Sequence, residues 1–457
     1  MKFFSTRYSF LLIGDFIITF LSVNVATVLR MYLHYYDSWQ SYFPLFIKAL
    51  VCSLLVVFTC FFIDLYNIER IKHRKEMIIK ILMSAFFAAT AIAVISFFSS
   101  SIIIGRGVLF IALCISALLQ IIWHVTFSEL SRIQATARKV LILGTGPAAY
   151  NMGNMLVSRN NGFALAGYVN CVGEPIHVPE PSIIGNGDRL LATAVKEKIQ
   201  KIVVSLSERR GTFPVREVLD CKLNGIDVVD GPSFYEQLTG KLLIENMNPS
   251  HMIFSEGFRT TDLRKLLKRL CDVLFAIVGI VLSLPLFIIV PIIIKMNSKG
   301  PVLFKQERIG EGEKRFMLYK FRTMIDGAEK DSGPVWSQEG DNRITKIGKL
   351  LRKTRIDEIP QLFNVFQGDM SFIGPRPERP FFVESLKKQI PYYSERNCIK
   401  PGITGWAQVR YEYGDSVEDA IEKLRYDLYY VKYQSITLDL IILLDTIKVI
   451  FFGKGGR

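Results

Sequence analysis

Hydrophobic positions gather in long runs over the N-terminal part of the chain, in a pattern typical of membrane-spanning helices. Each run approaches the roughly 20 apolar residues that an α-helix needs to cross a bilayer. Four such runs come first along the chain, at 8–30, 44–66, 77–99 and 107–128. Lysine and arginine flank them unevenly, ten on one side against three on the other, and cytoplasmic loops carry the excess of positive charge. We therefore predict a four-span helical bundle over 1–135 with both ends in the cytoplasm.

Two ionisable side chains, Asp15 and His124, fall inside these apolar runs. An ionisable group within the bilayer is costly, so it marks either a functional site or a polar contact between helices. At these depths we favour the polar contact.

A different pattern begins at Lys139, where short apolar runs alternate with amphipathic helical patterns. The segment Lys139–Ala149 has the pattern of a buried strand, a tight turn and a helix start. Later apolar runs lie at 164–169, 201–205 and 226–229, and helical patterns at 188–199 and 214–224. Such alternation predicts a doubly wound parallel sheet. We therefore expect a Rossmann-like α/β domain over 139–255, ending near the linker Asn248-Pro249-Ser250.

The turn Gly144-Thr-Gly-Pro-Ala-Ala149 is a partial dinucleotide-binding motif, which also needs an acidic residue about 20 positions further on. The next predicted strand instead ends in Tyr168-Val-Asn170, and the domain has no Tyr-x-x-x-Lys pair. Two interpretations stay open for this domain: an NAD-dependent sugar dehydratase or epimerase, and a regulatory or dimerising module that binds a nucleotide or nothing. We favour the module.

A fifth apolar run, Val273–Ile294, holds 22 uncharged residues and has basic residues at both flanks. It contains Pro285 and Pro291, and an interior proline removes a hydrogen bond and kinks a helix. A complete crossing would also place the rest of the chain outside the cell, away from cytoplasmic nucleotides. We predict a re-entrant, proline-broken membrane helix over 270–296 that enters and leaves the same leaflet. An ordinary fifth transmembrane helix is the alternative.

Composition and charge narrow the functional classes. Half of the residues are hydrophobic and the mean hydropathy is +0.28, which is more apolar than an ordinary soluble protein. The formal net charge of +14 suits anionic lipids or anionic small substrates. Because no basic-aromatic recognition motif accompanies this charge, we expect no nucleic-acid partner. The seven cysteines are scattered without metal-ligand spacing, which indicates reduced thiols.

The densest chemical signal lies in the run from Arg352 to Pro377. Two adjacent carboxylates, Asp357 and Glu358, follow two arginines and precede the rigid turn Gly374-Pro-Arg-Pro377. Cations beside carboxylates and beside an expected anionic ligand suit phosphoryl chemistry, where charge must be neutralised as it moves. A salt-bridged helix start followed by a loop is the alternative, because surface ion pairs are common. The membrane context favours the first interpretation.

The C-terminal part carries further motifs in a fixed order around this run. They are Lys268-Arg-Leu-Cys-Asp272, the proline-broken helix, Gly300-Pro-Val-Leu-Phe-Lys-Gln306, Lys320-Phe-Arg-Thr-Met324, Asp341-Asn-Arg343, Pro360-Gln-Leu-Phe-Asn364 and Lys400-Pro-Gly-Ile-Thr-Gly-Trp-Ala-Gln408. With these motifs, residues 262–457 resemble the bacterial sugar transferase family, the monotopic polyprenyl-phosphate phosphoglycosyl transferases. The whole arrangement resembles the long-form members, which start exopolysaccharide or O-antigen repeat units.

The resemblance implies that a UDP-sugar gives its sugar 1-phosphate to undecaprenyl phosphate and that UMP leaves. Asp357 matches the family's nucleophile, which would form an aspartyl-phosphosugar intermediate. Glu358 would help Asp357 hold Mg²⁺. Arg352 and the metal would offset the charge of the diphosphate, and Arg376 would bind a phosphate or the uridine. Lys320 matches a basic family position and would contact a phosphate.

Two further residues of the matching motifs, Asp341 and Arg343, are candidates for substrate binding, and Asp272 is expected to anchor the re-entrant helix. The tail Ser435–Phe452 is apolar but interrupted by charges, which suits a helix on the membrane surface or one packed on the domain core. A non-catalytic scaffold would not need to keep the carboxylate pair. The resemblance also implies an α-rich monotopic catalytic domain over 262–457 on the cytoplasmic face of the bacterial inner membrane. It further implies UDP-glucose or UDP-galactose as the donor, contact with membrane lipid, and a homodimer.

Overall fold

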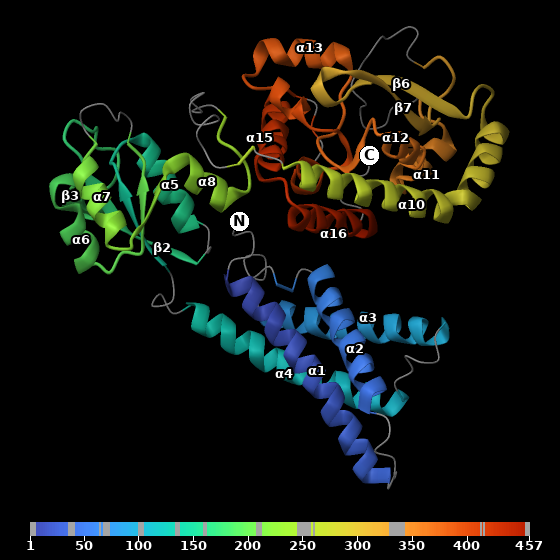
Figure 1. Cartoon of the computed structure of the whole chain (residues 1–457), viewed down its shortest axis with the longest axis horizontal. Helices are drawn as coiled ribbons and strands as arrows, with labels where there is room; N and C mark the ends of the chain where they lie inside the picture. Colours follow the sequence, from blue (N-terminus) through green and yellow to red (C-terminus); the bar gives the residue numbers. More distant parts are fainter. Residues whose placement is uncertain are drawn as a thin grey trace. The chain divides into compact units, whose positions relative to one another are not determined.

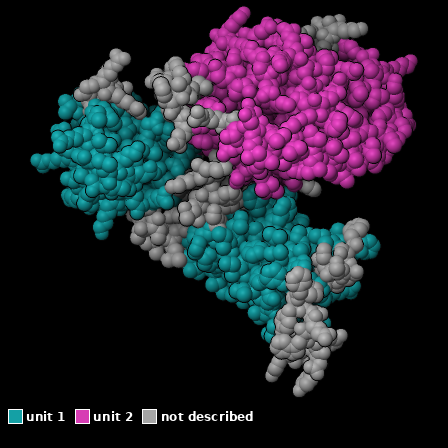
Figure 2. All heavy atoms as spheres, in the orientation of Figure 1, with its two compact units in different colours: residues 1–238 teal, residues 239–457 magenta. Residues whose placement is uncertain are grey.

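The computed structural model divides the chain into two compact units, Met1–Leu238 and Thr239–Arg457 (Figure 2). It describes residues 6–34, 42–63, 65–66, 74–98, 105–132, 138–158, 162–206, 213–244, 257–258, 261–328, 343–411, 414 and 416–452.

The N-terminal unit begins with four helices at the positions of the four predicted apolar runs. They are α1 (Thr6–His34), α2 (Tyr42–Phe62), α3 (Arg74–Phe98) and α4 (Arg106–Arg132) (Figure 1). Among the described helices, α1, α3, α4 and α10 (Asp262–Asn297) are long and apolar enough to cross a membrane, whereas the apolar part of α2 is shorter. Leu11 and Ala117 pack inside the bundle, while Phe86 and Ile122 are exposed on its outside. Apolar residues on both faces of a helix are typical of contact with lipid. Four apolar helices at the predicted positions are therefore confirmed, and a membrane crossing by α2 stays a prediction.

Asp15 of α1 and His124 of α4 contact one another inside the bundle, with 2.9 Å between Asp15 Oδ2 and His124 Nε2. Both side chains are buried. One turn further along α1, the hydroxyl oxygens of Thr19 and Ser116 lie 3.0 Å apart. Each polar group thereby avoids facing hydrocarbon alone. The predicted polar contact between helices is confirmed.

The rest of the N-terminal unit is a five-stranded parallel sheet in the order β3-β2-β1-β4-β5. Its strands are β1 (Arg138–Leu143), β2 (Phe163–Asn170), β3 (Ile183–Asn186), β4 (Lys201–Val204) and β5 (Asp227–Asp230). Its helices are α5 (Pro147–Ser158), α6 (Leu190–Lys196), α7 (Val215–Leu223) and α8 (Gly231–Thr239). Helices α6 and α7 cover one face, where Leu141 and Leu143 pack against Leu190 and Val218, and α5 and α8 lie on the other (Figure 1). A parallel sheet with helices is therefore confirmed.

The turn after β1 shows why this segment carries glycine. Gly144 has φ +128°, and a Cβ there would lie 2.4 Å from the backbone oxygen of Ser205. The next residue, Thr145, donates its hydroxyl hydrogen to Oδ1 of Asn170 at 3.1 Å. Asn170 ends β2, where a dinucleotide site would carry its acidic residue. Thr145 thus joins the ends of β1 and β2.

The C-terminal unit is rich in helices and holds two small pairs of strands. The antiparallel pair is β6 (Leu303–Ile309) with β7 (Arg315–Phe321), and the parallel pair is β8 (Ser371–Ile373) with β9 (Gly402–Thr404). After α10, its helices are α11 (Lys346–Lys353), α12 (Gln361–Gln367), α13 (Pro380–Gln389), α14 (Trp406–Arg410), α15 (Val417–Tyr433) and α16 (Ile436–Phe452). Short 3₁₀ turns include Ile356–Glu358 and Ser394–Cys398.

Helix α10 is continuous through Pro285 and Pro291 and changes direction along its course (Figure 1). The helix therefore kinks without being interrupted, and its entry and exit through one leaflet stays a prediction. The parts of α10 before and after Pro285 both contact the C-terminal unit. Ala276, before the proline, packs in one apolar cluster of this unit, and Val290 and Ile294, after it, pack in another. Many other large apolar side chains of α10 are exposed.

Helix α16 packs on the C-terminal unit through one side. Leu438 and Ile442 are buried, and the hydroxyl oxygens of Thr446 and Thr404 lie 2.7 Å apart. This confirms the interpretation in which the tail helix packs on the domain core. Contact of its exposed residues, such as Leu440, with a membrane stays a prediction.

Candidate active site

The adjacent carboxylates Asp357 and Glu358 lie in a short 3₁₀ turn between α11 and α12. Thr345 caps α11 by accepting a hydrogen bond from Gly348 N at 2.9 Å. After α11 ends, Arg355 takes a left-handed conformation with φ +59°, which reverses the chain. Both carboxylates then enter the interior of the unit, where Asp357 is 6% and Glu358 8% exposed.

Helix α10 supports the backbone of this turn directly. Ile356 and Ile359, which flank the two carboxylates, pack on the cluster that contains Val290 and Ile294 of α10. A Cβ at Gly279 would lie 3.1 Å from the side chain of Leu362 in α12. Only one layer of side chains therefore separates the carboxylates from α10.

Glu358 is surrounded by basic side chains. Its Oε1 accepts hydrogen bonds from Lys320 Nζ and from Arg376 Nη2, both at 2.8 Å. Arg355 Nη1 lies 3.7 Å from the same oxygen. Burial alone would raise the pKa of Glu358, but Lys320 and Arg376 outweigh it and hold that pKa well below its usual value. Glu358 is thus a fixed anion.

Asp357 has the opposite environment. Burial raises the pKa of Asp357, and the negative charge of Glu358 adds to this effect, although Lys320 and the nearby arginines oppose it. Its Oδ1 is buried without a hydrogen-bond partner among the described residues. Neighbouring carboxyls whose pKa values are moved apart mark different chemical roles. Asp357 therefore presents a buried, unpartnered carboxyl oxygen, whereas the carboxylate of Glu358 holds Lys320 and Arg376 in place.

The structure brings Lys320, Arg352 and Arg376 together at the pair Asp357–Glu358, called the dyad below, as the sequence predicted. Arg376 extends from the Gly374-Pro-Arg-Pro377 turn, and its Nη1 donates to Gln408 Oε1 at 2.9 Å. Arg352 Nε donates to the hydroxyl of Thr323 at 2.9 Å, and its charge lowers the pKa of Asp357. These cations come from β7, α11 and the turn after β8, so only the tertiary fold gathers them.

Two other predicted residues are Arg343 and Asp341. Arg343 Nη1 donates to the backbone oxygen of Ala328 at 3.3 Å. Asp341 lies outside the described residues. Asp272 Oδ1 accepts hydrogen bonds from Ser371 Oγ and Phe372 N, each at 3.0 Å, which confirms its role as an anchor of α10.

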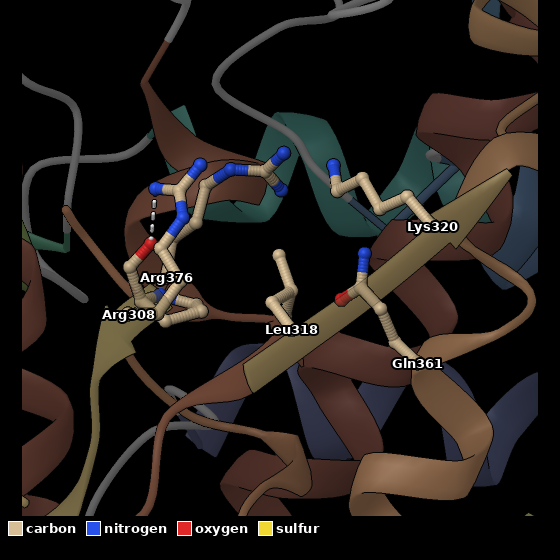
Figure 3. A pocket seen from close by; sticks show the side chains of 6 residues that line it. Arg308, Leu318, Lys320, Gln361 and Arg376 are labelled. Carbon is tan, nitrogen blue, oxygen red and sulfur yellow. Dashed lines mark hydrogen bonds between the residues drawn. The ribbon is translucent and has the colours of Figure 1, made fainter. Parts of the chain in front are cut away.

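A small pocket opens beside the dyad, and its lining includes residues that the sequence analysis missed (Figure 3). It is lined by Arg308, Leu318, Lys320, Gln361, Arg376 and Pro377. The basic ends of Arg308, Arg376 and Lys320 gather around it (Figure 3). Arg308 lies two residues after the Gly300–Gln306 motif, and Gln361 lies within the Pro360–Asn364 motif. Their proximity to these motifs was the available signal. Such a basic lining suits an anionic group.

The dyad fits a magnesium ion whose other ligands are water molecules and substrate phosphates. The described residues contain no group of three or more His, Cys, Asp or Glu side chains arranged to hold a metal. Mg²⁺, however, usually binds through one or two carboxylates together with water and substrate phosphates. The unpartnered Oδ1 of Asp357 is suited to this kind of site.

Two family models match the chain. The bacterial sugar transferase family matches residues 263–453, and a CoA-binding domain family matches residues 62–213. The first match covers nearly the whole C-terminal unit with the dyad. The second begins within the membrane region and continues through most of the parallel sheet.

The chain is similar to several characterised or named bacterial proteins. A UDP-N-acetylgalactosamine-undecaprenyl-phosphate N-acetylgalactosaminephosphotransferase of Aeromonas hydrophila is 40% identical over 237 residues, covering 52% of this chain and 55% of that protein. An undecaprenyl-phosphate glucose phosphotransferase of Komagataeibacter xylinus is 32% identical over 70% of this chain and 60% of its own length. These alignments therefore span little more than half of either relative.

A shorter relative is matched more completely. It is a Bacillus subtilis protein named as an undecaprenyl-phosphate N-acetylgalactosaminyl 1-phosphate transferase, and it is 51% identical over 130 residues, which are 28% of this chain and 72% of that protein. With the two family matches, this shows that the chain belongs to the bacterial sugar transferase family, as a long-form member in which membrane helices and a parallel-sheet domain precede the transferase domain.

Proposed function

We propose that this protein transfers a sugar 1-phosphate from a UDP-sugar to undecaprenyl phosphate, as the first step in assembling a polysaccharide repeat unit. The observation that carries the proposal is a buried carboxyl, Asp357, whose unpartnered oxygen lies among cations. Its turn packs on α10, a helix with many exposed apolar side chains. The names of the relatives describe transfer to the same kind of acceptor.

The reaction would proceed in two displacements at phosphorus. In the first, an oxygen of Asp357 forms a bond to the phosphorus that carries the sugar, and the bond from that phosphorus to UMP breaks. In the second, an oxygen of undecaprenyl phosphate attacks the same phosphorus and releases the Asp357 carboxylate. Both partners in each step are anionic, so Lys320, Arg352 and Arg376 lower the barrier by offsetting their charges.

We also propose that Asp357 and Glu358 hold Mg²⁺ when substrate is present. Bound there, the ion would supply positive charge to the diphosphate oxygens. Chelation is the direct test, and its expected outcome is given in the Discussion.

Helix α10 supports a position at the membrane surface. Its two parts pack on the same unit, and its remaining apolar side chains are exposed, as expected for a helix that enters and leaves one leaflet. In a cysteine-free background, Lys265→Cys and Lys299→Cys should both react with an impermeant thiol reagent from the cytoplasmic side. Labelling of the two positions from opposite sides would show instead that α10 spans the bilayer.

The decisive experiment on function is UMP release across a panel of UDP-sugars, with and without undecaprenyl phosphate. Wild type should release about one UMP per enzyme without acceptor and should retain the sugar phosphate covalently, because the first displacement needs no lipid. Asp357→Asn should do neither. UMP release that begins only on adding lipid would exclude the two-step reaction, and a wild-type rate in Asp357→Asn would exclude this nucleophile.

The same panel identifies the sugar. The names of the relatives divide between N-acetylgalactosamine and glucose, so UDP-N-acetylgalactosamine belongs in the panel beside the predicted UDP-glucose and UDP-galactose.

For the sheet domain we propose a regulatory or dimerising role within a homodimer. Equilibrium binding of NAD, UDP and coenzyme A, together with the mass of the detergent-solubilised protein, tests that role.

A further inference from the structure

A buried arginine behind the active site has no role in the reaction described so far. Arg396 lies in the 3₁₀ turn Ser394–Cys398 and is 6% exposed. It does not line the pocket beside the dyad. Its Nη2 donates a hydrogen bond at 2.9 Å to the backbone oxygen of Arg376, the residue whose side chain meets Glu358.

The guanidinium of Arg396 is itself held on two sides. Its Nη2 lies 2.8 Å from Oδ2 of Asp427 in α15, and its Nη1 donates to the hydroxyl of Tyr393 at 2.9 Å. Asp427 and Tyr393 are buried, at 2% and 3% exposed. Because an arginine fork has fixed geometry, these partners determine where it presents its hydrogen to the Arg376 oxygen.

The turn that carries Arg376 is held by both backbone and side-chain donors. Pro375 and Pro377 fix its backbone dihedrals but have no N–H to donate. The oxygen of Pro375 accepts a hydrogen bond from Gly402 N at 2.9 Å. Side chains hold the next two carbonyl groups: Arg396 Nη2 donates to the oxygen of Arg376 and Arg308 Nη1 to that of Pro377, each at 2.9 Å. Because this turn is rigid, a shift of the Arg376 backbone would also shift the Arg376 guanidinium.

We propose that Arg396, oriented by Asp427, is a positioning residue that holds the Arg376 backbone so that the Arg376 guanidinium meets Glu358 and the donor phosphate. This proposal rests on the proposed function, since it assigns to Arg396 a part in loading the enzyme from the UDP-sugar. Arg396 acts through Arg376 and does not itself touch the reacting atoms.

A purely structural role for the Arg396–Asp427 pair makes a different prediction. Buried ion pairs are often replaceable by apolar residues of similar volume without loss of stability, whereas removing one partner is strongly destabilising. The double variant Arg396→Met with Asp427→Leu therefore separates the two roles. It should restore a thermal midpoint lost in Arg396→Met alone, yet leave the Arg376 oxygen without its donor.

The test is kcat/KM for UMP release in the double variant, in Arg376→Met, and in the two combined. We expect the double variant to lose about tenfold to a hundredfold in kcat/KM, as displaced catalytic groups do. In an Arg376→Met background, the same double substitution should lower kcat/KM little further. Arg425→Met is the matched control, because Arg425 also pairs with a carboxylate, Glu422 at 2.7 Å. The proposal would be overturned if the double substitution lowered kcat/KM equally in the wild-type and Arg376→Met backgrounds, or if the folded double variant kept full activity.

A second readout does not depend on activity. In a structure of the double variant, we expect Arg376 Nη2 to move out of hydrogen-bond reach of Glu358 Oε1, from which it lies 2.8 Å in the wild type. An unchanged Arg376–Glu358 pair would overturn the positioning role, whatever the enzyme turns over. A wild type that releases no UMP from any UDP-sugar would overturn the proposed function instead, and would leave this measurement to decide the role of Arg396.

Discussion

Lys320→Met is the substitution that most directly tests how the dyad is tuned. Burial raises the pKa of Asp357, and Lys320 is the largest influence that opposes this rise. A nucleophilic Asp357 must be ionised, so the rate of UMP release should fall as pH drops through this raised pKa. Removing the ammonium group should raise the pKa further and move the acid limb of the pH–rate profile to higher pH. The loss of activity should therefore be recovered in part at alkaline pH.

The size of the shift follows from the loss of one neighbouring charge. An opposite charge within hydrogen-bonding range of a carboxyl pair typically shifts its pKa by about one to three units, so the acid limb should move by about that much. The assay is kcat/KM for UMP release between pH 5 and about 9, where the limb reports the dyad as a unit. Lys320→Arg should keep the wild-type limb, as should Lys346→Met at an exposed position. A Lys320→Met enzyme that is slower at every pH with an unmoved limb would refute the electrostatic argument and leave only a lost phosphate contact.

Four other outcomes are expected. Chelation of divalent ions by EDTA should abolish UMP release and added Mg²⁺ should restore it; an unchanged rate would exclude the metal. His124→Leu should lower the thermal midpoint in detergent by the equivalent of about 1 kcal/mol, and adding Asp15→Leu should recover it. Gly348→Ala should destabilise the transferase unit by about 1–3 kcal/mol in thermal unfolding, since its Cβ would lie 1.9 Å from the Thr323 backbone oxygen. Ser416→Ala should cost about 1 kcal/mol in the same assay, because its hydroxyl accepts from Asp419 N at the start of α15.

The elements of the fold that the sequence predicts well are those in which one physical requirement dominates. Long apolar runs must be helical in a bilayer because each backbone polar group needs a partner within its own segment. The same cost predicted a polar contact between helices at Asp15 and His124, and the structure shows that these two residues, 109 positions apart in the chain, are partners. Alternation of short buried strands with helices predicted the parallel sheet in the same way.

The candidate site could be predicted only in part. Motifs identified Asp357 and Glu358 and the basic residues around them, but which oxygen each cation contacts depends on how β7 and the turn after β8 approach α12. Arg355 adopts a left-handed conformation that usually favours glycine. An arginine at this position therefore does not indicate that the chain reverses there. Arg343 belongs to a matching motif yet bonds to Ala328. Adjacency in a motif does not determine where a long side chain ends.

The packing of α10 links its membrane position to the chemistry of the dyad. If α10 crossed the bilayer, one of its two parts would have to leave the transferase unit. That separation would expose either Ala276 with its cluster or Val290 and Ile294 with theirs, at about 1.5–3 kcal/mol for each large apolar side chain. Because Ile356 and Ile359 pack on the second cluster, the same separation would also release the turn that carries Asp357. A non-spanning α10, as proposed, would therefore keep the turn that carries Asp357 packed on the helix that contacts the lipid, where a membrane-bound phosphate would reach it without leaving the headgroup level.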